Sequence, residues 1–218
     1  VYSNVPILIA CLNTHDIFVQ LKKMGLSHRV IFIHQLKIEN QKKLYGFYHF
    51  DQKSCNNVEA SVWIDNFEGN WGGIEDWSHD VVMMLRKENV QAFVLESCNQ
   101  NVQRDELEQF IIRVDRNLQQ WLTTHLQLIH VLYSKMPFVL FNNRSREVLY
   151  AAEILKCLYP DQVKIITVLH CDLDRCFKEH VAWDSYIDKY LCISSMIQRN
   201  FCMQQRIGAD RTVVRTNI

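Results

Sequence analysis

The sequence predicts an α/β protein built on a Rossmann-like, mostly parallel sheet with helices on both faces. Short, continuous apolar runs recur along the chain, and such runs are typical of strands that are buried on both faces. Segments with apolar residues three or four positions apart alternate with these runs, as crossover helices between parallel strands do. The 218 residues are 48% hydrophobic and 22% charged, which is ordinary for a globular chain.

The overall charge is balanced, with 24 Lys and Arg residues against 24 Asp and Glu residues. We therefore expect no nucleic-acid partner, because nothing in the composition attracts a polyanion. No apolar run is long enough to span a bilayer and no signal peptide opens the sequence. We expect a cytoplasmic protein without a transmembrane segment, and peripheral membrane contact stays open. Eight cysteines without a C-x-x-C motif favour reduced thiols, and neither a metal site nor a cofactor is expected.

Residues 1–57 are expected to form an N-terminal α/β extension or the tail of an upstream unit. Within residues 5–36 we predict a strand in VPILIACL, a helix in THDIFVQLKKMG and a strand in RVIFIHQL. Gly25 lies where a glycine commonly ends a helix. Residues 37–57 are polar, with YGFYHF as a candidate short strand.

Residues 58–218 are expected to form the Rossmann-like domain. The first predicted elements are a strand in EASVWIDNF, a helix in IEDWSHDVVMMLRK and a strand in VQAFVLES. In the helix, Trp77, Val81 and Leu85 lie four residues apart and so give it one apolar face.

The remaining elements follow in clear alternation after one ambiguous stretch. Residues 104–134 fit one long helix, but the strand composition of QFIIRV favours a strand near 109–114 and a helix over 117–134. Ser145 is a candidate N-cap for the helix that follows, and an irregular stretch is expected before Asp184. The predicted strands and helices here are, in order, PFVLFNN, SREVLYAAEILKCL, VKIITVLH, KYLCIS, SMIQRNFCMQQRI and TVVRTNI.

Half of the six glycines lie in one predicted strand-to-helix loop, NFEGNWGGIEDW, at Gly69, Gly72 and Gly73. Ligands of parallel sheets collect at the carboxyl ends of the strands. Glycines there allow a ligand to approach the backbone closely, and the start of the next helix favours an anion such as phosphate. The motif is neither G-x-G-x-x-G nor a P-loop, so a simple turn remains an alternative.

Polar residues also end the later strands on what should be the same edge of the sheet. His170 directly follows VKIITVL, and a structural imidazole is the alternative to a site residue. Asn142 also fits a loop-ordering amide, and Ser194 also fits a helix cap. With the glycine loop, the candidate site residues are Trp71, Gly72, Gly73, Asn142, Asn143, Arg144, His170, Asp172 and Ser194.

The order of several motifs resembles the N-terminal, acceptor-side domain of a GT-B fold glycosyltransferase. The resembling family is the large retaining family that includes sucrose synthases and bacterial polysaccharide glycosyltransferases. The motifs lie between about Ala60 and Ile218 and are GGIE, VLFNN, IITVLH, IDKYLCISSMIQRNF and ADRTVVRTNI. The last motif ends in TNI where the family usually has Asn-Gly.

The resemblance implies a hexosyltransferase of polysaccharide biosynthesis, with a nucleotide-sugar donor and a saccharide, lipid-linked or other acceptor. It implies that Gly72 and Gly73 approach the donor diphosphate and that His170 is the catalytic residue contacting the transferred sugar. Trp71 lies within the glycine loop, and its aromatic ring could stack on a sugar, so it is a candidate cleft residue. The family's Glu-x7-Glu motif belongs to a C-terminal donor-binding domain of the same polypeptide. We expect that domain to be absent here, which would leave the isolated chain inactive.

Glu88 and Glu96 have the Glu-x7-Glu spacing, but they fall across a predicted helix–strand junction, so we interpret the match as coincidence. Two other functions stay open. One is a non-catalytic binding or assembly domain of the same fold. The other is half of a sugar-nucleotide epimerase.

Overall fold

In the computed structural model, the described residues of the chain form two parallel sheets. The smaller sheet has two strands and the larger has seven. The structure describes residues 7–9, 20–26, 30–32, 59–67, 73–97, 108–116, 121–143, 145–181 and 183–215.

The seven-stranded sheet has the order β5-β4-β3-β6-β7-β8-β9, and every neighbouring pair is parallel. This confirms the predicted α/β class and the Rossmann-like sheet. The chain moves outward from β3 in one direction and from β6 in the other, so these two central strands form a topological switch point. The strands are β3 (Ser61–Asp65), β4 (Ala92–Ser97), β5 (Ile111–Val114), β6 (Phe138–Asn142), β7 (Val163–Leu169), β8 (Lys189–Cys192) and β9 (Thr212–Val214).

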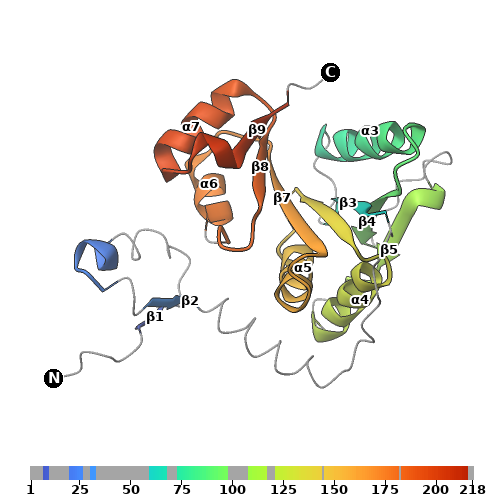
Figure 1. The fold of residues 1–218 in the computed structure, drawn as a ribbon, viewed down its shortest axis with the longest axis horizontal. Coiled ribbons are helices and arrows are strands. Elements are labelled where there is room, and N and C mark those ends of the chain that lie inside the picture. The colour runs from blue at the N-terminus through green and yellow to red at the C-terminus, as the bar shows by residue number, and fades with distance from the viewer. Residues whose placement is uncertain are drawn as a thin grey trace.

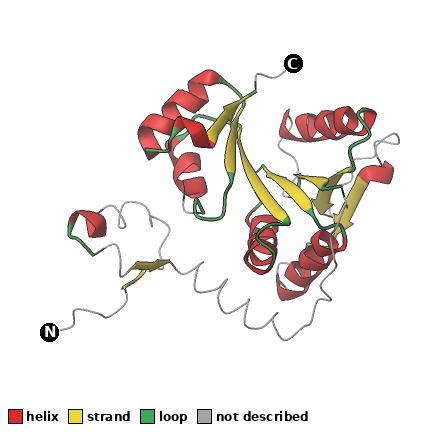
Figure 2. Ribbon diagram, viewed as in Figure 1, coloured by secondary structure: helices red, strands yellow, loops and turns green. Residues whose placement is uncertain are grey.

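Within the described segments, five α-helices connect these strands, and Figures 1 and 2 show α3 on the opposite side of the sheet from α4 and α5. Two short 3-10 helices, η2 (Glu108–Phe110) and η4 (Ala209–Arg211), precede β5 and β9. The α-helices are α3 (Gly73–Lys87), α4 (Trp121–Ser134), α5 (Arg146–Leu158), α6 (Asp174–Val181) and α7 (Ser195–Gln205).

Side-chain alternation along β3 explains why both faces are covered. Val62 and Ile64 pack in one core cluster with Val82 of α3. Trp63 points to the other face and joins the larger cluster, which includes Leu155 of α5. All five residues of β3 are buried, as expected for the centre of a doubly covered sheet.

The predicted division of residues 104–134 is confirmed in its described part, and so are the predicted cap at Ser145 and the cap that was the alternative role of Ser194. The stretch divides into β5 and α4, as its composition favoured. Ser145 caps α5 by accepting a hydrogen bond from the backbone N–H of Val148, at 3.2 Å. Ser194 caps α7 in the same way, with the backbone N–H of Ile197 as donor at 3.2 Å.

The prediction of an irregular stretch before Asp184 was wrong, because α6 occupies much of it. Phe177 is the buried residue of this short helix, and its ring lies 5.1 Å from that of Phe201 on α7, centroid to centroid. Lys178 also pairs with Asp174 one turn earlier, at 2.9 Å. One aromatic anchor therefore holds a helix whose sequence lacks a regular apolar stripe.

The described parts of the N-terminal extension agree with its prediction. β1 (Ile7–Ile9) and β2 (Val30–Phe32) pair in parallel, and residues 20–23 are helical. Gly25 has φ 72°, and its N–H binds the carbonyl of Lys22, as a glycine at a helix C-terminus does. The candidate strand YGFYHF lies outside the described residues.

The cysteines of the described segments, Cys157, Cys171, Cys176, Cys192 and Cys202, are all free thiols. Only Cys192 among them is fully buried, and the others are half-buried. Within the same segments, no helix has the length and hydropathy that crossing a bilayer requires.

Glu153 on α5 offers a test of how this core is packed. The residue is 0% exposed, and neither carboxyl oxygen has a hydrogen-bond partner. Burial raises the pKa of this carboxyl well above its ordinary value, so the native protein keeps a proton that the unfolded chain releases. Stability is therefore lost as the pH rises above the ordinary pKa of a glutamate.

We expect Glu153→Met to raise the free energy of unfolding at pH 7 by roughly 1–3 kcal/mol, because it replaces an unpartnered buried polar group. Urea unfolding at pH 7 and at pH 4 measures the effect, and the gain should shrink at the lower pH. Glu179→Met on the exposed side of α6 is the control, with an expected change below about 0.5 kcal/mol. A destabilising Glu153→Met substitution would contradict the account.

Candidate functional site

The carboxyl ends of the strands carry a connected set of buried polar side chains. The carboxylate of Asp65 is the central acceptor of this network. Asp65 ends β3 and is 1% exposed. Its Oδ2 accepts hydrogen bonds from Asn142 Nδ2 at 2.8 Å and from the backbone N–H of Ser145 at 2.9 Å. Its Oδ1 accepts one from the N–H of Phe67 at 3.0 Å. One carboxylate therefore ties the ends of β3 and β6 together at the switch point.

The side chain of Asn143 contacts the backbone of Asp65 and connects three elements. Its Nδ2 lies 2.6 Å from the backbone oxygen of Asp65 and 3.0 Å from Oγ of Ser78 on α3. Its Oδ1 lies 2.8 Å from Nε2 of His170, the residue that follows β7. The amide thus joins the ends of β3 and β7 to the side of α3.

His170 lies at the edge of the sheet, half-buried, with its ring against Trp77 of α3. The two ring centroids are 5.4 Å apart and the planes meet at 81°. Burial lowers the pKa of His170 to about 4, so the imidazole is neutral at physiological pH. A neutral imidazole has one nitrogen that donates and one that accepts, so it can receive a hydrogen bond from a ligand hydroxyl.

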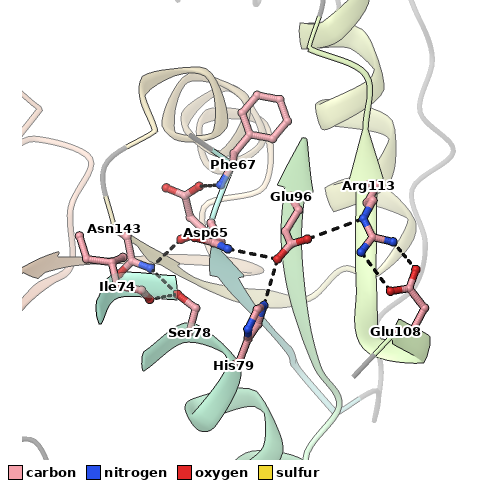
Figure 3. A network of polar contacts seen from close by, with 10 residues as sticks. Asp65, Phe67, Ile74, Ser78, His79, Glu96, Glu108, Arg113 and Asn143 are labelled. Carbon is pink, nitrogen blue, oxygen red and sulfur yellow. Dashed lines mark hydrogen bonds and ion pairs between the residues drawn. The ribbon is translucent and has the colours of Figure 1, made fainter. Parts of the chain in front are cut away.

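A second polar cluster surrounds Glu96 near the carboxyl end of β4, and Figure 3 shows how it continues the first. Glu96 is 0% exposed, and its Oε1 accepts from Asn66 Nδ2 at 3.1 Å. The same oxygen lies 3.0 Å from Nε2 of His79, which is 1% exposed. Asn66 follows Asp65 and His79 follows Ser78, so the two clusters share adjoining backbone.

Arg113 of β5 completes the cluster on its outer side. Its Nε lies 3.7 Å from Oε2 of Glu96, which is an ion pair but too long for a hydrogen bond. The other guanidinium nitrogens bind the carboxylate of Glu108 in a two-point contact (Figure 3). The carboxyl ends of β3 and β4 therefore carry the acidic residues Asp65 and Glu96, and that of β5 carries the basic residue Arg113.

The structure brings several predicted site residues to this one edge. Gly73 is the first residue of α3, so the end of the glycine loop and His170 are linked through the α3 residues Trp77 and Ser78. Among the described residues outside its own helix turn, no atom lies within 4 Å of a side-chain carbon added at Gly73. Trp71, Gly72 and Arg144 lie outside the described residues.

Asn142 and Ser194, two other predicted site residues, have structural contacts that match the alternatives weighed for them. Asn142 orders the turn before α5 by donating to Asp65 and to the backbone oxygen of Ser145. Ser194 caps α7. Asp172, beyond His170, accepts a hydrogen bond from Asn200 of α7 at 2.7 Å.

The predicted site did not include Asp65, Asn66, Ser78, His79 or Glu96. The strand-end rule that selected Asn142 and His170 applies equally to SVWIDN and AFVLES, where polar residues also end apolar runs. It would have identified Asp65 and Glu96. Nothing local marks Ser78 and His79, because their partners come from β4 and from the end of β6.

Comparison with known proteins does not assign the site. No protein-family model matches the chain, and no curated protein matches it significantly.

Removing the Asp65 carboxylate should destabilise the domain strongly. Asp65→Ala leaves the donors of Phe67, Asn142 and Ser145 buried without their acceptor, so we expect a loss of roughly 3–5 kcal/mol in the free energy of unfolding. Urea unfolding measures it, with Asp80→Ala on the exposed side of α3 as the control. A loss below about 1 kcal/mol would show that the switch point does not depend on this carboxylate.

The depressed pKa of His170 predicts a pH effect on stability. A histidine of the unfolded chain titrates near 6.5 and His170 near 4, so between these values the unfolded chain binds more protons. Stability should therefore fall as the pH drops from 6.5 towards 4, and His170→Gln should lose less over this range than the wild type. His130→Gln, on the exposed side of α4, should keep the wild-type slope. Identical slopes in all three proteins would rule out a buried neutral His170.

Proposed function

We propose that the chain is the acceptor-side domain of a glycosyltransferase that moves a hexose from a nucleotide-sugar to a saccharide or lipid-linked acceptor. The observation that carries the proposal is the position of His170. Its neutral imidazole lies at the carboxyl edge of a parallel sheet, next to the helix that begins at Gly73. That edge is where open α/β sheets bind their ligands.

The start of α3 suits the diphosphate of a nucleotide-sugar. The 15-residue helix begins at Gly73, and the first N–H groups of a helix have no partner within it. These groups and the helix dipole favour an anion at this end. The open space around Gly73 supports close approach of a phosphate to the backbone. In the proposed reaction, these donors stabilise the negative charge that develops on the leaving diphosphate.

His170 suits the sugar side of the reaction. At physiological pH its imidazole carries no charge, so it does not compete with the helix start for the diphosphate. It can position a hydroxyl by a hydrogen bond. Trp77 contacts its ring directly, and Ser78 is linked to it through Asn143, so His170 is connected to α3. The proposed sugar-binding group and the proposed diphosphate-binding helix start therefore lie on elements that contact each other.

The proposal includes a partner domain. In the resembling family, the donor binds mainly to a second, C-terminal domain, and the described residues of this chain contain one seven-stranded sheet. Transfer requires stabilisation of the transition state from both sides of the cleft. We therefore expect the 218-residue chain to bind acceptor glycans without releasing nucleoside diphosphate at a rate typical of complete enzymes.

A glycan array tests the proposal directly. The labelled chain should bind a defined class of saccharides, and His170→Ala should weaken that binding at least about tenfold, which corresponds to about 1.4 kcal/mol. His130→Ala is the matched control and should bind like the wild type. Absence of saccharide binding, or binding that His170→Ala leaves unchanged, would contradict the proposal. Epimerised nucleotide-sugar in a parallel incubation would favour the epimerase alternative instead.

Gly73→Val separates a role in ligand approach from a role in folding. A side chain at this position meets open space, so the free energy of unfolding should stay within about 0.5 kcal/mol of the wild type. If a diphosphate approaches the backbone here, the added methyl groups should weaken binding of uridine diphosphate at least about tenfold. Backbone amide NMR shifts of α3 during titration report the affinity. Equal affinity of both proteins would remove the diphosphate from this helix start.

A further inference from the structure

The buried amide of Asn143 has one orientation that its neighbours permit. Its nitrogen lies 2.6 Å from the backbone carbonyl oxygen of Asp65, which can only accept a hydrogen bond. Its second neighbour, Ser78 Oγ at 3.0 Å, donates its own proton to the carbonyl of Ile74 at 2.8 Å and so also acts as an acceptor. Exchanging the amide nitrogen and oxygen would place oxygen against oxygen at 2.6 Å. The side-chain oxygen of Asn143 must therefore face His170.

This orientation determines which nitrogen of His170 carries the hydrogen. Asn143 Oδ1 has no proton to give and lies 2.8 Å from Nε2 of His170, so Nε2 must be the donor. A neutral ring that is protonated on Nε2 has a lone pair on Nδ1. No hydrogen bond to Nδ1 occurs within the described part of the chain. The edge-on contact with Trp77 further restricts the plane of the ring.

We propose that Asn143 is a positioning residue that holds His170 in the Nε2–H tautomer, so that Nδ1 accepts a hydrogen bond from a hydroxyl group of a saccharide. Asp65 and Ser78 act indirectly, because they accept hydrogen bonds from Asn143 Nδ2 and so fix the orientation of its amide. The identity of the ligand as a saccharide rests on the proposed function. The tautomer follows from four contacts alone: the two of Asn143 Nδ2, the bond from Ser78 to Ile74 and the contact of Asn143 Oδ1 with His170. The two parts can therefore fail separately.

Burial of the ring is consistent with this arrangement. It lowers the pKa of His170 to about 4, so a single neutral tautomer can persist across physiological pH. A freely rotating amide at position 143 would allow either tautomer. An amide that is 5% exposed and bonded on both sides allows one. The arrangement resembles the common device in which a second group orients a functional histidine.

Long-range proton–nitrogen NMR of the chain labelled with ¹⁵N-histidine tests the tautomer at pH 8. In the wild type, the spectrum should show His170 protonated on Nε2 alone. A ring protonated on Nδ1, or a mixture of both forms, would overturn the proposal without any variant being made. His170→Gln identifies the signals.

Two substitutions test whether Asn143 is responsible. Asn143→Leu removes the acceptor, so the His170 signals should become those of a tautomer mixture. Asn143→Gln keeps an amide that can donate to Asp65 and accept from His170 Nε2, and should retain the Nε2–H form, which is a rescue that a purely steric role would not produce. Gln198→Leu is the matched control, because it removes an amide whose bond goes to Thr212 instead. An unchanged tautomer in Asn143→Leu would remove the positioning role, and so would loss of the Nε2–H form in a folded Asn143→Gln protein.

The same variants on the glycan array test the ligand part. Asn143→Leu should weaken saccharide binding several-fold, and Asn143→Gln should weaken it less. If the wild-type tautomer is as proposed but no saccharide binds, the proposed function fails and the positioning role of Asn143 stands. If saccharides bind but the ring is protonated on Nδ1, the positioning role fails and the proposed function stands.

Discussion

The carboxylate of Asp65 makes the hydrogen bonds on which the carboxyl edge of this sheet depends. At the switch point, the chain leaves β3 and β6 in opposite directions, and the backbone groups that follow the two strands cannot pair with each other. Asp65 supplies the missing acceptors to Phe67, Asn142 and Ser145. Because it is buried, each of these contacts is protected from water, and losing it would leave the donors unsatisfied. A charged group at the centre of the sheet therefore serves first to hold two strand ends together.

The other polar residues at this edge of the sheet differ in whether their hydrogen-bonding atoms already have partners within the fold. Asn142 and Ser194 make hydrogen bonds to the turn and the helix that they order, so these contacts belong to the fold. His170 is different, because only one of its two ring nitrogens has a partner among the described residues. Gly73 is different as well, because no described residue outside its own helix turn comes within 4 Å of a side-chain carbon added there. This contrast, more than the presence of polar residues as such, separates a ligand-binding role from a structural one.

The Glu96 cluster shows that buried charge at a strand end is not sufficient to identify a ligand site. Glu96 receives hydrogen bonds from Asn66 and contacts His79, and Arg113 lies nearby with its remaining donors on Glu108. Every charged group has an opposite charge or a donor beside it, as buried ionic groups require. The cluster shares backbone with the His170 network and so makes that edge of the sheet more rigid. A rigid support of this kind is what a preorganised site needs.

The sequence by itself determined the alternation of strands and helices, the caps at Ser145 and Ser194 and the position of His170 at a strand end. These features depend on residues that lie close together in the chain, so local periodicity and capping chemistry are sufficient to predict them. Tertiary structure decided the rest. α6 forms because Phe177 meets Phe201 of another helix. Asp65, Ser78 and Asn143 combine because contacts over 65 to 78 residues of sequence separation bring them together. The direction of one buried amide, and with it the acceptor atom of His170, depends on those distant neighbours, and no local pattern of residues records them.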